Sequence, residues 1–241
     1  MDLFPAMDLR AGRVVRMRRG DPASEFVYDP DPFAVARRYV EAGARWAHVI
    51  DLDRVFGFGA QTGLVARLAH GAALRLQVGG GLGTPEDAAA VLAGGAERAI
   101  LRPAALRAPG GLAAFARRFH PVRLALAVDA HRGSVDLGES DGGGEARSVP
   151  AADLAREAAD AGIRTVVYTD LGREGGLGGA DVAGAAALAR EAGVEVIVSG
   201  GVSTLDDLVA IRRAGLAGAV VGRALFEGRF TLREALACSS S

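Results

Sequence analysis

The sequence contains no lysine, because all 28 basic residues among its 241 positions are arginines. This absence excludes Schiff-base chemistry on a lysine side chain and the lysine of an ATP-binding phosphate loop. The net charge is -1 at pH 7, so no summed positive field attracts a nucleic acid or an anionic membrane. We therefore expect neither as a partner, and any bound anion must be held by local groups.

Cysteine is almost absent as well, since Cys238 is the only one. A single thiol builds neither a disulfide framework nor a zinc cluster, and His70, His120 and His131 show no metal-ligand spacing, so we expect no metal. No run of about 18 apolar residues occurs, and the first ten residues do not resemble a secretion signal. These features predict a cytoplasmic protein.

Strand-like and helix-like segments alternate along the whole chain. The helix-like stretches include 32–42, 85–93, 150–161 and 205–213, each opening with a proline or a capping residue. Such alternation implies right-handed βαβ units and a parallel sheet, and eight units predict a single closed (β/α)8 barrel over residues 1–241. The eight predicted strands are 3–8, 46–51, 74–78, 98–101, 123–129, 165–169, 194–199 and 217–222.

An internal repeat supports closure. Residues 78–87 align with 198–207, and 99–105 align with 219–225, at a constant offset of 120. Gly12 likewise resembles Gly133. A chance pairing would not keep so nearly constant an offset, so the repeat predicts two half-barrels of about 1–120 and 121–241.

Two aspartates occupy equivalent positions in this repeat. Asp8 and Asp129 end the first and fifth predicted strands, on the face where the loops of such barrels carry reacting groups. Two carboxyl groups over one cavity act as general acid and general base when their environments separate their pKa values. The alternative is that each aspartate only caps the following loop; the repeat favours catalysis.

Glycine clusters follow several of the predicted strands. Gly80 and Gly81, Gly200 and Gly201, and Gly222 stand where backbone N–H groups can bind phosphate. Each cluster alone is weak support, because glycine-rich loops are common. As symmetric copies they predict a ligand with two phosphates that spans the barrel mouth.

The symmetry breaks after the fourth strand. Arg102-Pro103 corresponds there to Gly222-Arg223, so one site loses a flexible glycine and an N–H donor. The Arg102 guanidinium can replace them, because its fork suits phosphate. An Arg102 side chain that turns outward to solvent is an equally good interpretation.

Other polar residues are weaker candidates. We select Arg19 from the charged cluster 16–21, assigned to the first βα loop, although a charge run is usually a solvated surface. Asp51, Asp53 and Asp170 follow strands, and about half of such residues only hold loops. His48 and Trp46 are interpreted as packing residues.

Together these motifs resemble the phosphoribosyl-formimino aminoimidazole carboxamide ribotide isomerase family of histidine biosynthesis. The resemblance covers essentially the whole chain and rests on Ala6-Met7-Asp8-Leu9, the stretches 15–21, 48–53, 77–81 and 199–202, Thr169-Asp170 and residues 222–228.

The resemblance implies a cofactor-free Amadori rearrangement of a small substrate with two phosphates, carried out by a monomer. Asp8 matches the proton acceptor, Asp129 the proton donor and Thr169 an assisting threonine. Glu174 replaces an aspartate of the family, and Gly178 and Arg223 are further candidate binding residues. The chain also departs from the family at Arg102-Pro103, at Gly138-Glu139, which stands near the place of a tryptophan, and around Gln61, where the family has an asparagine.

Three hypotheses follow. The first is an active isomerase of histidine biosynthesis, with phosphoribosylanthranilate as a possible additional substrate. The second is a diverged paralogue whose substrate carries one phosphate, suggested by Arg102-Pro103. The third is a non-catalytic phosphate-binding barrel, since a fold does not fix a function.

Overall fold

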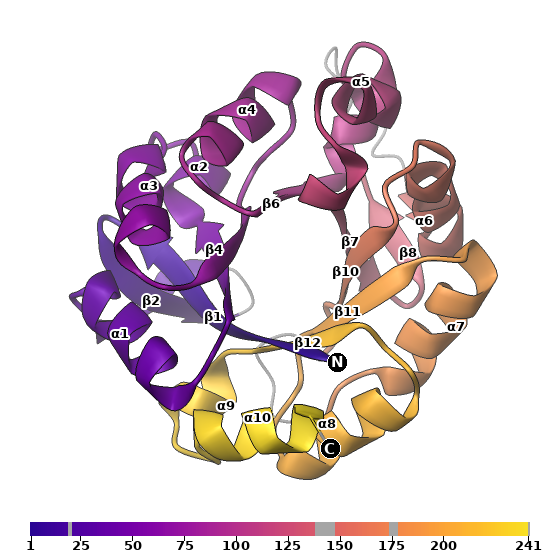
Figure 1. The fold of residues 1–241 in the computed structure, drawn as a ribbon. Coiled ribbons are helices and arrows are strands. Elements are labelled where there is room, and N and C mark those ends of the chain that lie inside the picture. Colours follow the sequence, from indigo (N-terminus) through magenta and orange to yellow (C-terminus); the bar gives the residue numbers. More distant parts are fainter. Residues whose placement is uncertain (19–20, 138–147, 174–177, 241) are drawn as a thin grey trace.

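Eight parallel strands form a closed ring, in the order β1-β4-β5-β6-β7-β10-β11-β12, with β12 paired to β1. The structure, a computed structural model, describes residues 1–18, 21–137, 148–173 and 178–240. Helices surround the ring on the outside (Figure 1). The ring strands are β1 (Asp2–Arg10), β4 (Trp46–Asp51), β5 (Arg75–Gly79), β6 (Arg98–Leu101), β7 (Leu124–His131), β10 (Thr165–Asp170), β11 (Glu195–Ser199) and β12 (Gly218–Val221).

The predicted (β/α)8 barrel is confirmed, and each predicted strand corresponds to one strand of the ring. The helices predicted over 32–42, 85–93 and 205–213 coincide with α1, α4 and α8, and that over 150–161 corresponds to α6. The helical segments are α1 (Pro32–Ala42), α2 (Leu52–Val55), α3 (Thr62–Gly71), α4 (Pro85–Ala93), η1 (Pro103–Arg107), α5 (Gly111–Arg118), η2 (Pro121–Arg123), α6 (Ala151–Asp160), α7 (Val182–Ala192), α8 (Leu205–Arg213), α9 (Arg223–Phe226) and α10 (Leu232–Ser240).

The local signals that set helix ends recur at the predicted offset. Thr84 accepts the Asp87 N–H while the Asp87 carboxylate accepts the Thr84 N–H, which is a capping box at the start of α4. Thr204 and Asp207 form the same box at α8. Each box satisfies two N–H groups that a helix start leaves unpaired.

The first βα connection, to which the charged cluster is assigned, contains two strands. β2 (Arg13–Arg18) pairs antiparallel with β1 and with β3 (Asp21–Asp29). Ala11 and Gly12 both have positive φ between β1 and β2, as do Arg132 and Gly133 before β8 (Ser134–Asp136), which pairs with β9 (Ser148–Pro150). Two consecutive positive φ values suit the tight turn of a twisted hairpin.

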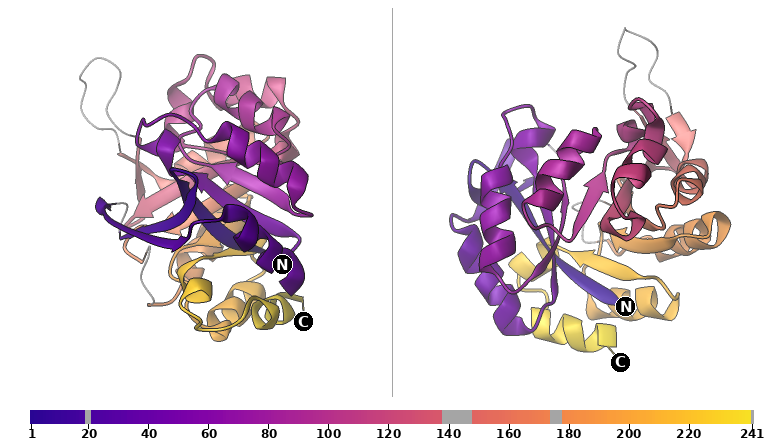
Figure 2. Two further views of the ribbon diagram at one scale, coloured as in Figure 1. Left: turned by 90° about the vertical axis from the view of Figure 1, so that its left-hand side faces the viewer. Right: turned by 45° about the horizontal axis from the view of Figure 1, so that its top comes forward.

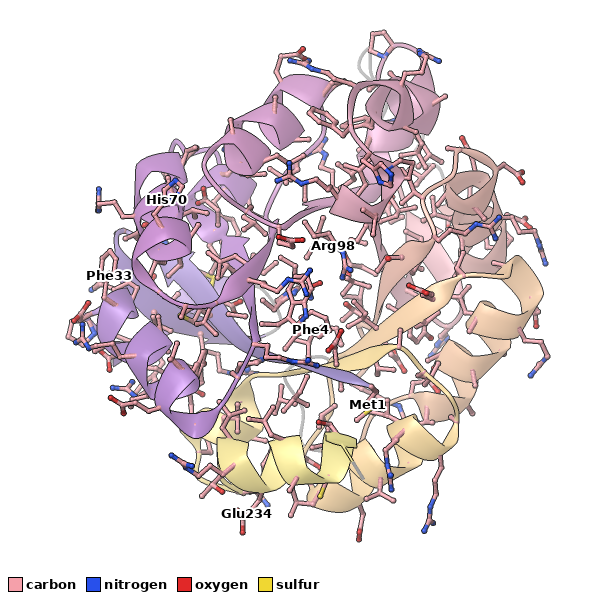
Figure 3. The ribbon with its side chains drawn as sticks, viewed as in Figure 1. Met1, Phe4, Phe33, His70, Arg98 and Glu234 are labelled. Carbon is pink, nitrogen blue, oxygen red and sulfur yellow. The ribbon has the colours of Figure 1, made fainter. Side chains whose placement is uncertain are left out.

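The core has two parts. One lies between the ring and the helices; the other, inside the ring, gathers Phe4, Trp46, Ile100, Ala125, Val167, Ile197 and Val220 from seven ring strands. Figure 3 shows Phe4 and Arg98 inside the ring, whereas Phe33, His70 and Glu234 lie at the periphery. In the left view of Figure 2 the two termini lie at the end opposite to the β2–β3 hairpin. The inner core fills the interior of the ring. We therefore look for the site at the carboxyl ends of the ring strands.

Candidate active site

A cavity of about 530 Å³ opens at the carboxyl ends of the ring strands. This size is within the range of small-molecule sites. The cavity brings together most of the residues predicted from the sequence, namely Asp8, Gly80, Gly81, Arg102, Asp129, Thr169, Gly200, Gly201, Gly222 and Arg223.

Asp8 and Asp129 lie on opposite sides of the ring. Three strands separate β1 from β7 in either direction around the barrel. Both residues line the same cavity, and below them Ala6 and Ala127 also line it with small side chains. The ring therefore presents two carboxyl groups to one bound molecule from two directions.

The environment of Asp129 favours its protonated form. Its side chain is open to the cavity, yet the surrounding protein desolvates the carboxylate and raises the pKa of Asp129 above its ordinary value. Thr169, paired directly with Asp129 between β10 and β7, donates a hydrogen bond that partly opposes this rise in pKa. A carboxyl group with a raised pKa is suited to donate a proton.

The glycines after β5 and β11 adopt backbone conformations that side chains resist. Gly80 and Gly81 have φ of 102° and 72°, and Gly200 and Gly201 have φ of 81° and 79°. A Cβ on Gly80 would lie 2.5 Å from the Asp51 carbonyl oxygen, so the backbone approaches too closely for any other residue.

The helix starts beyond these glycines supply few free donors. The Asp87 carboxylate already accepts from the N–H groups of Gly83 and Thr84. Asp207 accepts likewise from Ser203 and Thr204. An anion in the cavity must therefore be met by the glycine turns and by arginines rather than by the first turns of α4 and α8.

Among the described residues, three arginines line the cavity: Arg16 on β2, Arg102 after β6 and Arg223 at the start of α9. Within the described residues, the Arg102 guanidinium has no hydrogen-bond partner, and it lies over Gly83, where a Cβ would be 3.1 Å from its Nε. This position favours the interpretation in which Arg102 faces the ligand. Arg223 is ion-paired with Glu227.

The remaining acidic candidates hold loops. Asp51 accepts N–H groups from Arg54 and Gln61 at 3.2 and 2.7 Å. Asp53 accepts the Ala11 N–H at 3.1 Å, and Asp170 accepts the Gly172 N–H at 2.9 Å. None of these three aspartates is among the described residues that line the cavity.

His48 is buried as predicted, but it also lines the cavity. Its Nδ1 lies 3.0 Å from Nε2 of the fully buried Gln77, and Arg98 donates to the Gln77 Oε1 at 3.3 Å. Because Arg98 occupies the amide oxygen, the Gln77 NH₂ group faces His48 and Nδ1 accepts. Burial lowers the pKa of His48 to about 4, so its imidazole is neutral near pH 7.

Some predictions are not placed in the cavity. Arg19 and Glu174 lie outside the described residues, as do Gly138, Glu139 and the glycine-rich stretch 142–144. Gly178 is described and exposed, but it is not among the residues that line the cavity.

Sequence reasoning did not select several residues that line the cavity. Arg16 belongs to the charged cluster, but nothing in that run distinguishes it from Arg19. Ile50, Leu52, Val55 and Phe56 form an apolar side of the cavity next to β4. Apolar residues at such positions are usually interpreted as part of the hydrophobic core, so only the structure shows that these four line the cavity.

Comparison with known proteins decides the family. A family model described as "Histidine biosynthesis protein" matches residues 2–231. The chain belongs to the histidine biosynthesis protein family. This match and the isomerases described next together confirm the resemblance inferred from the motifs.

Individual members of the histidine biosynthesis protein family match the chain along its length. Three proteins named 1-(5-phosphoribosyl)-5-((5-phosphoribosylamino)methylideneamino) imidazole-4-carboxamide isomerase are similar to it. That of Moorella thermoacetica is 40% identical over 100% of this chain and 99% of its own length. Those of Symbiobacterium thermophilum and Thermus thermophilus are 42% and 40% identical, each over 98% of this chain, and over 96% and 98% of their own lengths.

Two further observations complete the description of this family member. The described residues include no group of three or more His, Cys, Asp or Glu side chains that could hold a metal ion. None of the helices within the described ranges is long and apolar enough to cross a membrane.

Proposed function

We propose that this chain is an aldose–ketose isomerase that performs an Amadori rearrangement on the doubly phosphoribosylated imidazole-4-carboxamide named in its relatives. The observation that carries the proposal is the pair Asp8 and Asp129, which line one cavity from opposite sides of the ring. Similarity over the full length of named isomerases supports this function over the other two hypotheses.

The rearrangement begins with ring opening. Asp129 donates a proton to the ribose ring oxygen, the C1–O bond breaks, and the C1–N linkage becomes an imine. The raised pKa of Asp129 supports this assignment, because the group holds its proton at a higher pH than an ordinary carboxyl group does. Thr169 orients the Asp129 carboxyl group through its hydrogen bond.

The second step moves hydrogen between carbons. Asp8 removes the proton from C2, giving an enol-amine. Asp8 then returns its proton to C1, while the C2 hydroxyl gives its proton to the Asp129 carboxylate and becomes a ketone, so both aspartates regain their starting states. One carbon is oxidised and its neighbour reduced, so the product is an isomer of the substrate and no external oxidant or reductant is consumed.

Two phosphate sites support the placement of the reacting sugar between the aspartates. The Gly80-Gly81 turn with Arg102 would hold one phosphate, and Gly200, Gly201 and the Gly222-Arg223 step would hold the other. The N–H groups of these glycines are the backbone donors, because Asp87 and Asp207 occupy those at the helix starts. Both aspartates and both proposed phosphate sites come from one chain, which supports a monomer acting on a small phosphorylated substrate.

The test is turnover of the diphosphate ribotide by the purified protein. Asp8→Asn and Asp129→Asn should each lower kcat by about 10²- to 10⁴-fold while leaving ligand binding nearly unchanged. Asp153→Asn, at an exposed carboxylate on α6, is the matched control and should have full activity. Absence of turnover in the parent protein, or full activity in both site variants, would contradict the proposal.

A further inference from the structure

The cavity has one aromatic wall, formed by Phe56. The chain has nine Phe, three Tyr and one Trp, and all of them lie within the described residues. Phe56 is the one among them that lines the cavity. The single tryptophan, Trp46, does not line the cavity. It packs against Phe4 in the inner core, with 5.3 Å between the ring centroids.

The wall around Phe56 is apolar, and further apolar side chains of the inner core, Ile100, Val167 and Val220, also line the cavity. Ile50, Leu52 and Val55 line the cavity beside it. Asp129, Thr169 and the glycine turns line other parts. The segment from β4 to α2 differs from the other apolar lining because it also carries an aromatic side chain. A ligand with both a charged phosphosugar and a planar ring would therefore place its ring against this segment.

Hydrogen bonds fix the position of this wall at both of its ends. The Asp51 carboxylate accepts from the N–H groups of Arg54 and Gln61. The Gln61 side chain accepts the Gly12 N–H at 2.8 Å, and this bond ties the segment to the turn after β1. The Phe56 N–H donates to the Leu52 carbonyl oxygen at 3.0 Å. A wall held in this way loses little entropy when a ligand binds.

Arg10 supports Phe56 from outside the cavity lining. Its guanidinium carbon lies 5.7 Å from the centre of the Phe56 ring and 5.5 Å from that of Phe58. Arg10 is itself held by Glu25 at 2.9 Å. Phe58 shares this neighbour, but it is 69% exposed and does not line the cavity. The two phenylalanines therefore share Arg10 as a neighbour, but Phe56 lines the cavity and Phe58 does not.

We propose that Phe56 is a specificity-determining residue that stacks on the heteroaromatic ring of the substrate. The inference rests on the proposed function, which identifies that ring as an imidazole-4-carboxamide. Stacking between an aromatic side chain and a planar heteroaromatic ring does not depend on the identity of the ring. It is strong enough to select ligands that carry a ring over phosphosugars that lack one.

The experiment compares two ligands by titration calorimetry. The first is 5-aminoimidazole-4-carboxamide ribotide, which carries the ring, and the second is ribose 5-phosphate, which lacks it. Phe56→Leu should weaken binding of the first by about tenfold and change binding of the second by less than about twofold. Phe56→Tyr keeps the aromatic face and should retain the parent affinity for both ligands, and Phe58→Leu should leave both affinities unchanged.

Two results would overturn the assignment: an equal loss for both ligands in Phe56→Leu, or no loss for either. Turnover of the diphosphate ribotide by the parent protein is measured separately. If turnover is absent but the loss specific to the ring persists, the proposed reaction is wrong and Phe56 still recognises the ring. If turnover is normal and no such specific loss occurs, the Phe56 assignment alone fails.

Discussion

Thr169 donates a hydrogen bond to the Asp129 carboxylate, and the two residues are direct partners across the parallel strands β10 and β7. The bond favours the ionised form of Asp129, whereas burial favours the protonated form and is the stronger effect. Thr169 therefore restrains the pKa of the group that we assign as the proton donor.

Replacing this threonine should change the pH profile in a defined direction. Thr169→Val removes the hydrogen bond, so the pKa of Asp129 rises further. Activity requires the protonated acid and is lost as pH rises through that pKa, so the alkaline limb of kcat/KM should move to higher pH. Thr169→Ser retains a hydroxyl donor and should keep the parent profile. A shift of the alkaline limb to lower pH would contradict the assignment of Asp129 as the acid.

His48 should make the protein less stable in mild acid. Its pKa is about 4 in the folded state and about 6.5 in an unfolded chain, so the unfolded state binds a proton first as the pH falls. The contribution to stability is fully present above about pH 6.5, and it is lost as pH falls towards 4. Between pH 7 and pH 5 the loss should be about 2 kcal/mol, measured by urea unfolding at both values.

The variant His48→Asn isolates this contribution, because it keeps a side-chain oxygen that can accept from Gln77 but has no group that titrates. The variant should lose about 2 kcal/mol less than the parent between the two pH values. An identical pH dependence in the two proteins would mean that carboxyl groups alone cause the acid sensitivity.

The sequence predicts the ring strands well because each is buried on both sides and reads as a short apolar run. The repeat then identifies Asp8 and Asp129 by their equivalent positions, without any knowledge of distance. The division into half-barrels near residue 120 remains an interpretation. It is supported by the paired capping boxes at Thr84 and Thr204 and by the paired turns at Gly12 and Gly133.

Other features escape prediction for physical reasons. β2 is rich in arginine, so it resembles a solvated charge run, and its strand conformation depends on pairing with β1 after a turn in which Ala11 adopts a positive φ. Asp51 and Asp53 look like site residues because they follow a strand, yet they hold the loop that positions Phe56. Which side of a loop faces a ligand depends on such tertiary contacts.

The Gly80 turn should tolerate no side chain. Gly80→Ala would place a Cβ 2.5 Å from the Asp51 carbonyl oxygen at a φ of 102°, which should destabilise the protein by about 2 kcal/mol or more. It should also raise KM, because we propose that the N–H groups of this turn bind a phosphate of the substrate. Gly63→Ala is the control: a Cβ there meets nothing within 4 Å, and Gly63 lies in α3, so stability should be unchanged or slightly higher. Equal unfolding midpoints for the two variants would contradict this account.

We predict that Arg102 decides whether the chain uses a substrate with two phosphates or with one. Pro103 provides no N–H, so the first proposed phosphate site would depend on the Gly80-Gly81 turn and on the Arg102 guanidinium, since Arg102 lines the cavity. Removing a charge-assisted hydrogen bond costs about 1.5–3 kcal/mol. Arg102→Leu should therefore raise KM for the diphosphate ribotide by about 10- to 100-fold, with little change in kcat.

Steady-state kinetics on two substrates separates this role from a structural one. A substrate that lacks the phosphate at this site should show the same KM with the parent protein and with Arg102→Leu. This substrate has no phosphate for Arg102 to contact, so removing the guanidinium changes nothing. Arg102→Lys, which keeps the charge but not the planar fork, should fall between the two for the diphosphate. If Arg102→Leu leaves KM for the diphosphate unchanged while the monophosphorylated sugar amine is the better substrate, the first site holds no phosphate and the paralogue hypothesis replaces the isomerase of histidine biosynthesis.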